Sequence, residues 1–138
     1  MATADLDRDG RIDLVIANNN APPTILMNFL AAAGRWVELE LVGSRSNRDA
    51  VGAAVRLTVG GRTMVRTVEA GSGYSAQSTH PLHFGLAQAA ELESLEVRWP
   101  SGEVEEYSGQ ALRELVPINV RSRLGEDDES AATAEAAT

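Results

Sequence analysis

The sequence predicts a mainly β protein: a small antiparallel β-sandwich or barrel-like domain, with a short strand pair before it and a disordered tail after it. Short alternating runs of apolar residues recur along the chain, and clusters rich in Gly, Pro, Asn and Ser separate them. This pattern is typical of antiparallel sandwiches and barrels. The last part of the chain, residues 121–138, is rich in Ala, Glu, Ser and Thr and almost lacks core-forming residues, which predicts disorder there.

Composition narrows the classes of function. A chain of 138 residues has room for one domain, or for one domain and a fragment of another. The net charge of −8 argues against nucleic-acid binding, which depends on basic patches. With no cysteine, the chain has no disulfide, zinc–thiolate site or thiol catalysis. No apolar run predicts membrane insertion, and residues 1–4 show no pattern of a signal peptide.

The first element is an acidic loop over residues 5–13, in which aspartates alternate and Gly10 takes the sixth position. Like charges this close repel one another unless a cation lies between them, and Ca²⁺ takes six to eight oxygen ligands in a flexible shell. We therefore expect a calcium site at this loop. The predicted metal ligands are the side chains of Asp5, Asp7, Asp9 and Asp13 and the backbone carbonyl of Arg11.

The loop differs from an EF-hand at one position. An EF-hand carries a bidentate Glu at its twelfth position and a helix on each side. Here the twelfth position is Ile16, inside the apolar run 14–17, which predicts a strand. The sequence thus predicts a calcium loop that leads into a strand, and a solvated acidic turn is the alternative. A break with two prolines follows, and residues 24–29 predict a second strand.

The predicted β-domain begins after a small linker at 31–34. Residues 35–42 alternate, with Val37, Leu39 and Leu41 on one face and Glu38 and Glu40 on the other. Strands over 51–59 and 62–70 are expected to form a hairpin, since Gly60-Gly61 between them is a strong signal for a two-residue turn.

Three more short strands complete the prediction, over residues 82–86, 95–99 and 103–107, the last two joined by a Pro-Ser-Gly turn. Residues 112–120 predict a turn followed by a last short strand at a sheet edge, because Pro117 cannot donate to a ladder. The predicted boundaries are therefore 1–30, 31–120 and 121–138.

Two family resemblances follow from these motifs. Residues 3–29 resemble part of one FG-GAP or VCBS repeat, the calcium-binding blade unit of integrin-type β-propellers. Residues 35–107 resemble the ASPIC/UnbV domain, which typically follows such repeats at the C-terminal end of secreted proteins such as the cartilage acidic protein group. The matching signatures are Ser46-Asn47-Arg48 with Gly52-Ala53, the run Arg66 to Ser78, His83-Phe84-Gly85-Leu86, and Val97 to Gly102. Ala87 departs from the family, which usually carries glycine there.

The resemblance implies a non-catalytic, calcium-binding module for protein or carbohydrate recognition or adhesion. It implies an extracellular, periplasmic or cell-surface location and a function as the C-terminal part of a longer propeller protein. The expected partners are the preceding propeller blades and an unidentified protein or glycan at the cell surface.

An enzymatic function is the alternative, in which this part of the chain is an accessory or capping domain of a propeller-based enzyme acting on a small molecule. The polar residues available for acid–base chemistry are Asp49, Tyr74, His80 and His83. The simpler interpretation is that His83, between two apolar strand residues, makes a structural hydrogen bond. We therefore expect no catalytic residues in this chain.

Overall fold

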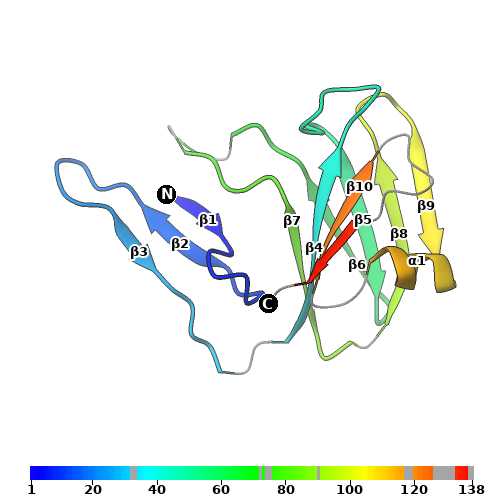
Figure 1. Cartoon of the computed structure of the whole chain (residues 1–138), viewed down its shortest axis with the longest axis horizontal. Helices are drawn as coiled ribbons and strands as arrows, with labels where there is room; N and C mark the ends of the chain where they lie inside the picture. Colours follow the sequence, from blue (N-terminus) through cyan, green and yellow to red (C-terminus); the bar gives the residue numbers. More distant parts are fainter. Residues whose placement is uncertain are drawn as a thin grey trace.

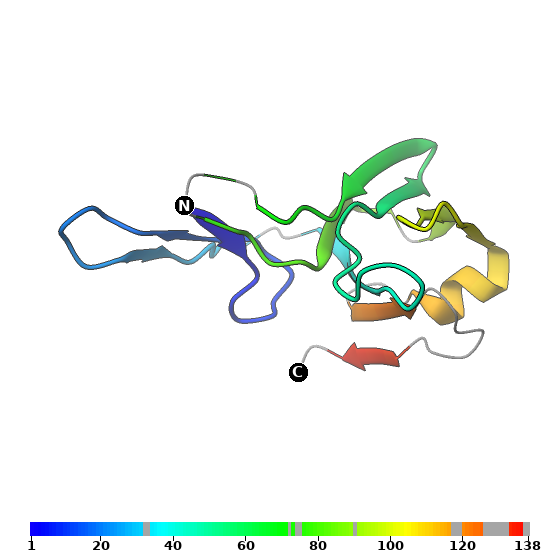
Figure 2. The same ribbon diagram turned by 90° about the horizontal axis from the view of Figure 1, so that it is seen from above.

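The computed structural model describes residues 1–31, 34–71, 73, 76–89, 91–116, 120–125 and 133–136. Across these residues the chain is mainly β, as predicted, with eleven strands in three sheets and one short helix. Two four-stranded sheets face each other and enclose the core, and a small three-stranded sheet extends from one side of this sandwich (Figures 1 and 2).

The small sheet is formed by the first thirty residues, in the order β1-β2-β3 with antiparallel neighbours. Its strands are β1 (Ala2–Ala4), β2 (Asp13–Ile16) and β3 (Thr24–Leu26). The acidic loop joins β1 to β2. The sequence prediction included β2 and β3 but not β1, whose three residues are too few to show a strand period.

The second sheet has the order β11-β10-β4-β7. Its strands are β4 (Arg35–Val42), β7 (Leu82–Ala87), β10 (Val120–Gly125) and β11 (Thr133–Ala136). The bounds of β4 are those predicted. β10 pairs with β4 in parallel, while the other pairs in this sheet are antiparallel.

The third sheet has the order β6-β5-β8-β9 and consists of two hairpins that are joined side by side. Its strands are β5 (Ala54–Val59), β6 (Arg62–Thr67), β8 (Leu92–Arg98) and β9 (Val104–Ser108). The predicted β5–β6 hairpin is confirmed, with Gly60 at φ 55° and Gly61 at φ 70°, the left-handed conformations that such a turn requires. Helix α1 (Gly109–Leu115) follows β9.

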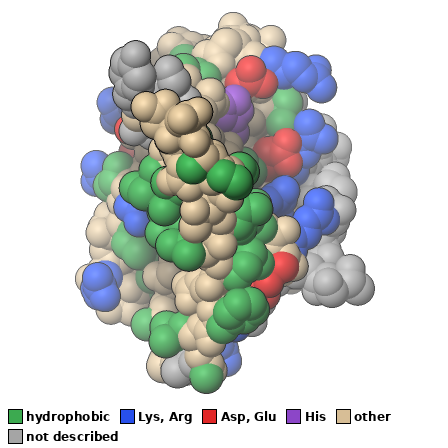
Figure 3. Space-filling view, turned by 90° about the vertical axis from the view of Figure 1, so that its left-hand side faces the viewer, with side chains coloured by type: hydrophobic (Ala, Val, Ile, Leu, Met, Phe, Trp, Pro, Cys, Tyr) green, Lys and Arg blue, Asp and Glu red, His purple; other side chains and the backbone are tan. Residues whose placement is uncertain are grey.

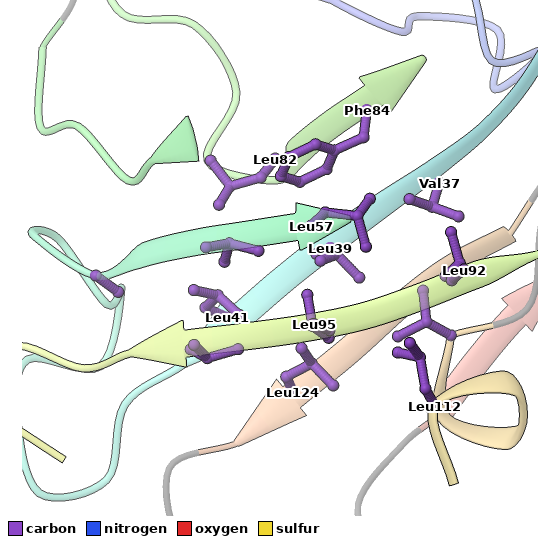
Figure 4. Packing of buried hydrophobic residues seen from close by; sticks show 14 of the residues in the cluster. Val37, Leu39, Leu41, Leu57, Leu82, Phe84, Leu92, Leu95, Leu112 and Leu124 are labelled. Atoms are coloured by element: carbon purple, nitrogen blue, oxygen red, sulfur yellow. The ribbon is translucent and has the colours of Figure 1, made fainter. Parts of the chain in front are cut away.

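The core lies between the two larger sheets (Figure 4). Leu39 on β4 and Phe84 on β7 point inward from one sheet, and Leu57 on β5 and Leu95 on β8 point inward from the other. All four are at most 1% exposed. Leu112 from α1 joins the same cluster, so the helix closes one side of the sandwich.

The structure differs from the sequence prediction in the C-terminal region. Residues 121–125, placed in the predicted disordered tail, belong to β10, where Ser122 and Leu124 are buried. Residues 133–136 form β11 against it. The composition of this stretch hides a two-residue alternation that directs Ser122 and Leu124 to the same face of the sheet. The rest of the predicted tail lies outside the described residues.

β10 also explains an unexpected burial on β4. Glu38 was expected on the face opposite the core residues, and its side chain is only 4% exposed. Its carboxylate accepts a hydrogen bond from Arg121 Nε at 2.7 Å. The pair links β4 to β10 across 83 residues of sequence, so the charge on Glu38 has an opposite charge beside it.

Candidate metal centre and its relatives

The acidic loop brings three of its aspartates together. One carboxylate oxygen from each of Asp5, Asp7 and Asp13 lies within 4.8 Å of the other two. Asp13 is 2% exposed, while Asp7 is exposed. At an effective dielectric constant of about 20, two unit charges at this separation repel by about 3.5 kcal/mol. A divalent cation that takes these carboxylate oxygens as ligands would offset this repulsion.

Backbone N–H groups fix two of these three carboxylates. The Asp5 carboxylate accepts hydrogen bonds from Asp9 N at 3.1 Å and from Gly10 N at 2.8 Å. Asp13 accepts from Leu6 N at 3.0 Å and from Asn28 N at 2.8 Å. Asp13 thereby ties the start of the loop to the segment after β3. Each oxygen keeps a further lone pair that can face an ion, so these hydrogen bonds are compatible with metal ligation.

Asp9 and Arg11, also predicted as ligands, are arranged differently. The Asp9 carboxylate forms an ion pair with the guanidinium of Arg11 and accepts a hydrogen bond from Arg11 N at 2.8 Å. Asp9 is not one of the three converging aspartates. The three side chains whose positions fit a shared cation are those of Asp5, Asp7 and Asp13. Ligation by Asp9 and by the Arg11 carbonyl stays a prediction.

The loop backbone turns through two left-handed residues, Arg8 at φ 60° and Gly10 at φ 82°. The second is the sixth position of the loop, where an L side chain would be strained at such a φ. Gly10 is also buried. Its place in the loop is therefore set by its conformation and by its close packing.

The small sheet is attached to the larger domain through β1. Thr3 N and Thr3 Oγ1 lie 3.2 and 3.0 Å from Ser78 Oγ, and Thr79 N donates to the Thr3 carbonyl at 3.3 Å. Figure 2 shows the segment before β7 passing alongside β1. Residues 1–30 thus contact the β-domain directly, in addition to preceding it in the chain.

The three described residues among those considered for catalysis do not form one group. His83 Nε2 is 2.9 Å from the Gly10 carbonyl, which agrees with the structural hydrogen bond expected for it. His80 contacts Gln77 and lines a hollow of about 150 Å³ together with Asp49. Tyr74, the fourth candidate, lies outside the described residues.

The fold and the site together define the chain as a β-sandwich module with an acidic loop beside it. A family model described as ASPIC and UnbV matches residues 43–130, and the chain belongs to that family. This confirms the resemblance inferred from the signatures between residues 46 and 102. The likeness of residues 3–29 to an FG-GAP or VCBS repeat stays a prediction.

Among characterised proteins, the chain is similar to cartilage acidic protein 1. It is 32% identical to the protein of Xenopus tropicalis over 107 residues, which cover 75% of this chain and 16% of the relative. The mouse protein is 30% identical over 104 residues, and the human protein 32% identical over 104, each match covering 72% of this chain. The chain spans about a sixth of the length of these relatives.

Among the described residues, no helix is long enough and apolar enough to cross a bilayer.

Proposed function

We propose that the chain is a non-catalytic calcium-binding module of a larger extracellular protein, with a function in recognition. The observation that carries the proposal is the convergence of the Asp5, Asp7 and Asp13 carboxylates, two of them fixed by backbone donors. Calcium would act structurally, by neutralising these charges and fixing the turn between β1 and β2. Similarity to cartilage acidic protein 1 supports an extracellular location, where calcium modules typically bind at 10⁻⁴–10⁻³ M.

Calcium titration tests this proposal. If Kd is about 1 mM, 10 mM CaCl₂ should raise the free energy of unfolding by about 1.4 kcal/mol, because a ligand that binds only the folded state stabilises it by RT ln(1 + [L]/Kd). Urea unfolding with and without Ca²⁺, together with calorimetry, measures both quantities. The Asp5→Asn and Asp7→Asn variants should lose the calcium-dependent shift.

The matched control is Asp49→Asn, which removes an exposed carboxylate elsewhere on the domain and should keep the full shift. Asp9→Asn separates the two ligand sets. If Asp9 remains paired with Arg11 in the bound state, its removal weakens binding less than removal of Asp7. A wild-type chain whose stability does not respond to millimolar Ca²⁺ would contradict the metal role.

The recognition role is supported by the surface of the small sheet. Figure 3 shows apolar side chains gathered on the side of the molecule where this sheet lies. Among the described residues, seven of the nine large hydrophobic residues that are exposed lie in the first thirty positions. They are Met1, Leu6, Ile12, Ile25, Leu26, Phe29 and Leu30. An exposed apolar patch of this kind typically marks a surface that another protein covers.

The pattern on β2 and β3 indicates what kind of partner covers it. Val15 lies opposite Ile25 on one face of the sheet, and Leu14 lies opposite Leu26 on the other. A sheet that is apolar on both faces is typical of one covered on both sides. We propose that preceding blades of the longer protein pack on it, with an unidentified protein or glycan at the cell surface as the ligand of the whole assembly.

A dye-binding experiment tests whether the patch is open in this chain. Wild-type protein should enhance the fluorescence of anilinonaphthalene sulfonate, and the double variant Ile25→Ser with Phe29→Ser should reduce it without lowering the melting temperature of the sandwich. Val65→Ser on β6, an exposed apolar residue far from the small sheet in sequence, is the control. A stable dimer in sedimentation, with no dye binding, would assign the patch to a second copy and contradict the proposal.

A further inference from the structure

Trp36 is buried, but it lies outside the main hydrophobic core. Trp36 is 7% exposed, yet it does not belong to the hydrophobic cluster between the two larger sheets. Trp36 shares the outer face of β4 with Glu38, while Val37 and Leu39 point into the core. Its register partner on β7 is Gly85, which has no side chain to occupy the space above the strand. Something other than the core therefore covers the indole.

That cover is the backbone of the acidic loop. Gly10 lies so close to the indole ring of Trp36 that a Cβ added at Gly10 would overlap the ring atoms. The loop can make this approach only with glycine at its sixth position, a second requirement beside the left-handed φ. This contact therefore keeps water away from both the indole ring of Trp36 and the loop backbone at Gly10.

His83 completes the contact. Its ring stacks on Trp36 with centroids 5.9 Å apart and an interplanar angle of 16°. Its Nε2 is 2.9 Å from the Gly10 carbonyl oxygen, and because a carbonyl only accepts, Nε2 carries the hydrogen. Gly10 is thus held on both sides. Its N–H donates to the Asp5 carboxylate at 2.8 Å, and its carbonyl accepts from His83.

We propose that Trp36 and His83 are positioning residues for the acidic loop and determine how tightly it binds Ca²⁺. The inference rests on the proposed calcium role and deepens it, because it assigns part of the affinity to the β-domain. A binding loop that is ordered for only a fraction of the time has its affinity reduced by that fraction. Docking on Trp36 and His83 raises the fraction in which Asp5 is held beside Asp7 and Asp13.

Thermodynamic linkage predicts that calcium binding in turn affects the docking of the loop on the β-domain. If docking of the loop strengthens calcium binding, calcium must strengthen docking by the same factor. Trp36 also serves as a local reporter, since its indole lies beside the loop and can sensitise the luminescence of Tb³⁺, a trivalent ion that replaces Ca²⁺ in oxygen sites. Trp99, the other tryptophan, is 2% exposed and lies within the core cluster.

The experiment compares Ca²⁺ and Tb³⁺ binding in four variants of the whole chain. By calorimetry, His83→Ala should raise the Kd for Ca²⁺ about tenfold, the usual worth of one hydrogen bond with its packing. His83→Gln, whose amide nitrogen can reach the Gly10 carbonyl, should stay within about threefold of wild type. Trp36→Phe should lose most Tb³⁺ emission excited through tryptophan while keeping the near-ultraviolet dichroism of Trp99. His80→Ala is the matched histidine control.

The outcomes separate this inference from the calcium proposal. Weaker binding in His83→Ala with recovery in His83→Gln would support the positioning role, and loss of sensitised emission in Trp36→Phe would place Trp36 beside the bound ion. Wild-type affinity in His83→Ala, in a folded protein that binds Ca²⁺, would overturn the positioning role and leave the calcium site intact. A wild-type chain that binds neither ion would overturn both.

Discussion

Replacing Arg121 with Met tests the pairing of β10 with β4 most directly. The substitution keeps an apolar stem of similar length and removes the guanidinium that donates to Glu38. The Glu38 side chain is 4% exposed and the Arg121 side chain 26% exposed. The variant thus leaves a buried carboxylate without its cationic partner, which is costlier than the loss of the ion pair itself.

The expected magnitude follows from these exposures. Removing one partner of a fully buried pair typically costs 3–5 kcal/mol, and the access of water to a quarter of the Arg121 side chain lowers our expectation to about 2–3 kcal/mol. Glu38→Gln should cost only about 1 kcal/mol, because the neutral amide needs no counter-charge and the remaining guanidinium reaches water. In the double variant the cost should fall well below the sum of the two single costs.

Urea unfolding of the wild type, both single variants and the double variant measures these quantities as a cycle. In thermal unfolding, the Arg121→Met loss corresponds to a decrease in melting temperature of roughly 10 °C for a chain of this size. Arg45→Met is the control, since the Arg45–Glu103 pair has a similar N–O distance of 2.8 Å but its side chains are 61% and 37% exposed, so that water reaches both. It should cost less than about 1 kcal/mol. An Arg121→Met cost as small as the control would refute the packing of β10 on β4.

Three further predictions concern strain, packing and ionisation. Ala87 has φ 54°, so Ala87→Gly should stabilise the fold by about 1 kcal/mol, whereas Ala54→Gly in β5 should destabilise it by about 0.5–1 kcal/mol; equal signs in urea unfolding would contradict this. Leu39 is fully buried, and Leu39→Ala should cost about 3 kcal/mol, while a cost below 1 kcal/mol would mean that its site collapses. Burial, with a hydrogen bond to Glu105, raises the pKa of Tyr107 above its ordinary value. The protonated hydroxyl is therefore favoured in the folded state, and this stabilisation is present below about pH 10 and lost at higher pH. Tyr107→Phe should make the decline in unfolding free energy between pH 9 and 12 less steep, and an unchanged slope would refute the assignment.

Local patterns were sufficient to predict most of the sandwich. The alternation over residues 35–42 and the Gly60-Gly61 pair each depend on neighbours in sequence, and the structure confirms both. These features are encoded within a few residues, so one unaligned chain is enough to find them.

Long-range contacts could not be predicted in the same way. The register of β10 against β4, and with it the burial of Glu38, depends on residues 83 positions apart. In the metal centre, the alternation of aspartates predicted a cluster, but the pairing of Asp9 with Arg11 depends on side-chain geometry within the loop. The contact of Trp36 with Gly10 was missed because the sequence offers the indole two burial sites, the core and the loop, with no local signal to distinguish them.

The insertion of β10 between β4 and β11 also affects how the protein is made. A ribosome adds β10 about eighty residues after β4, so the sheet that contains both cannot be completed while the chain is still being extended through β9. Closing so long a loop is slow compared with forming a hairpin. During this interval the edge of β4 that later accepts β10 is open to other chains, and nascent protein in this state is the form most in need of a chaperone.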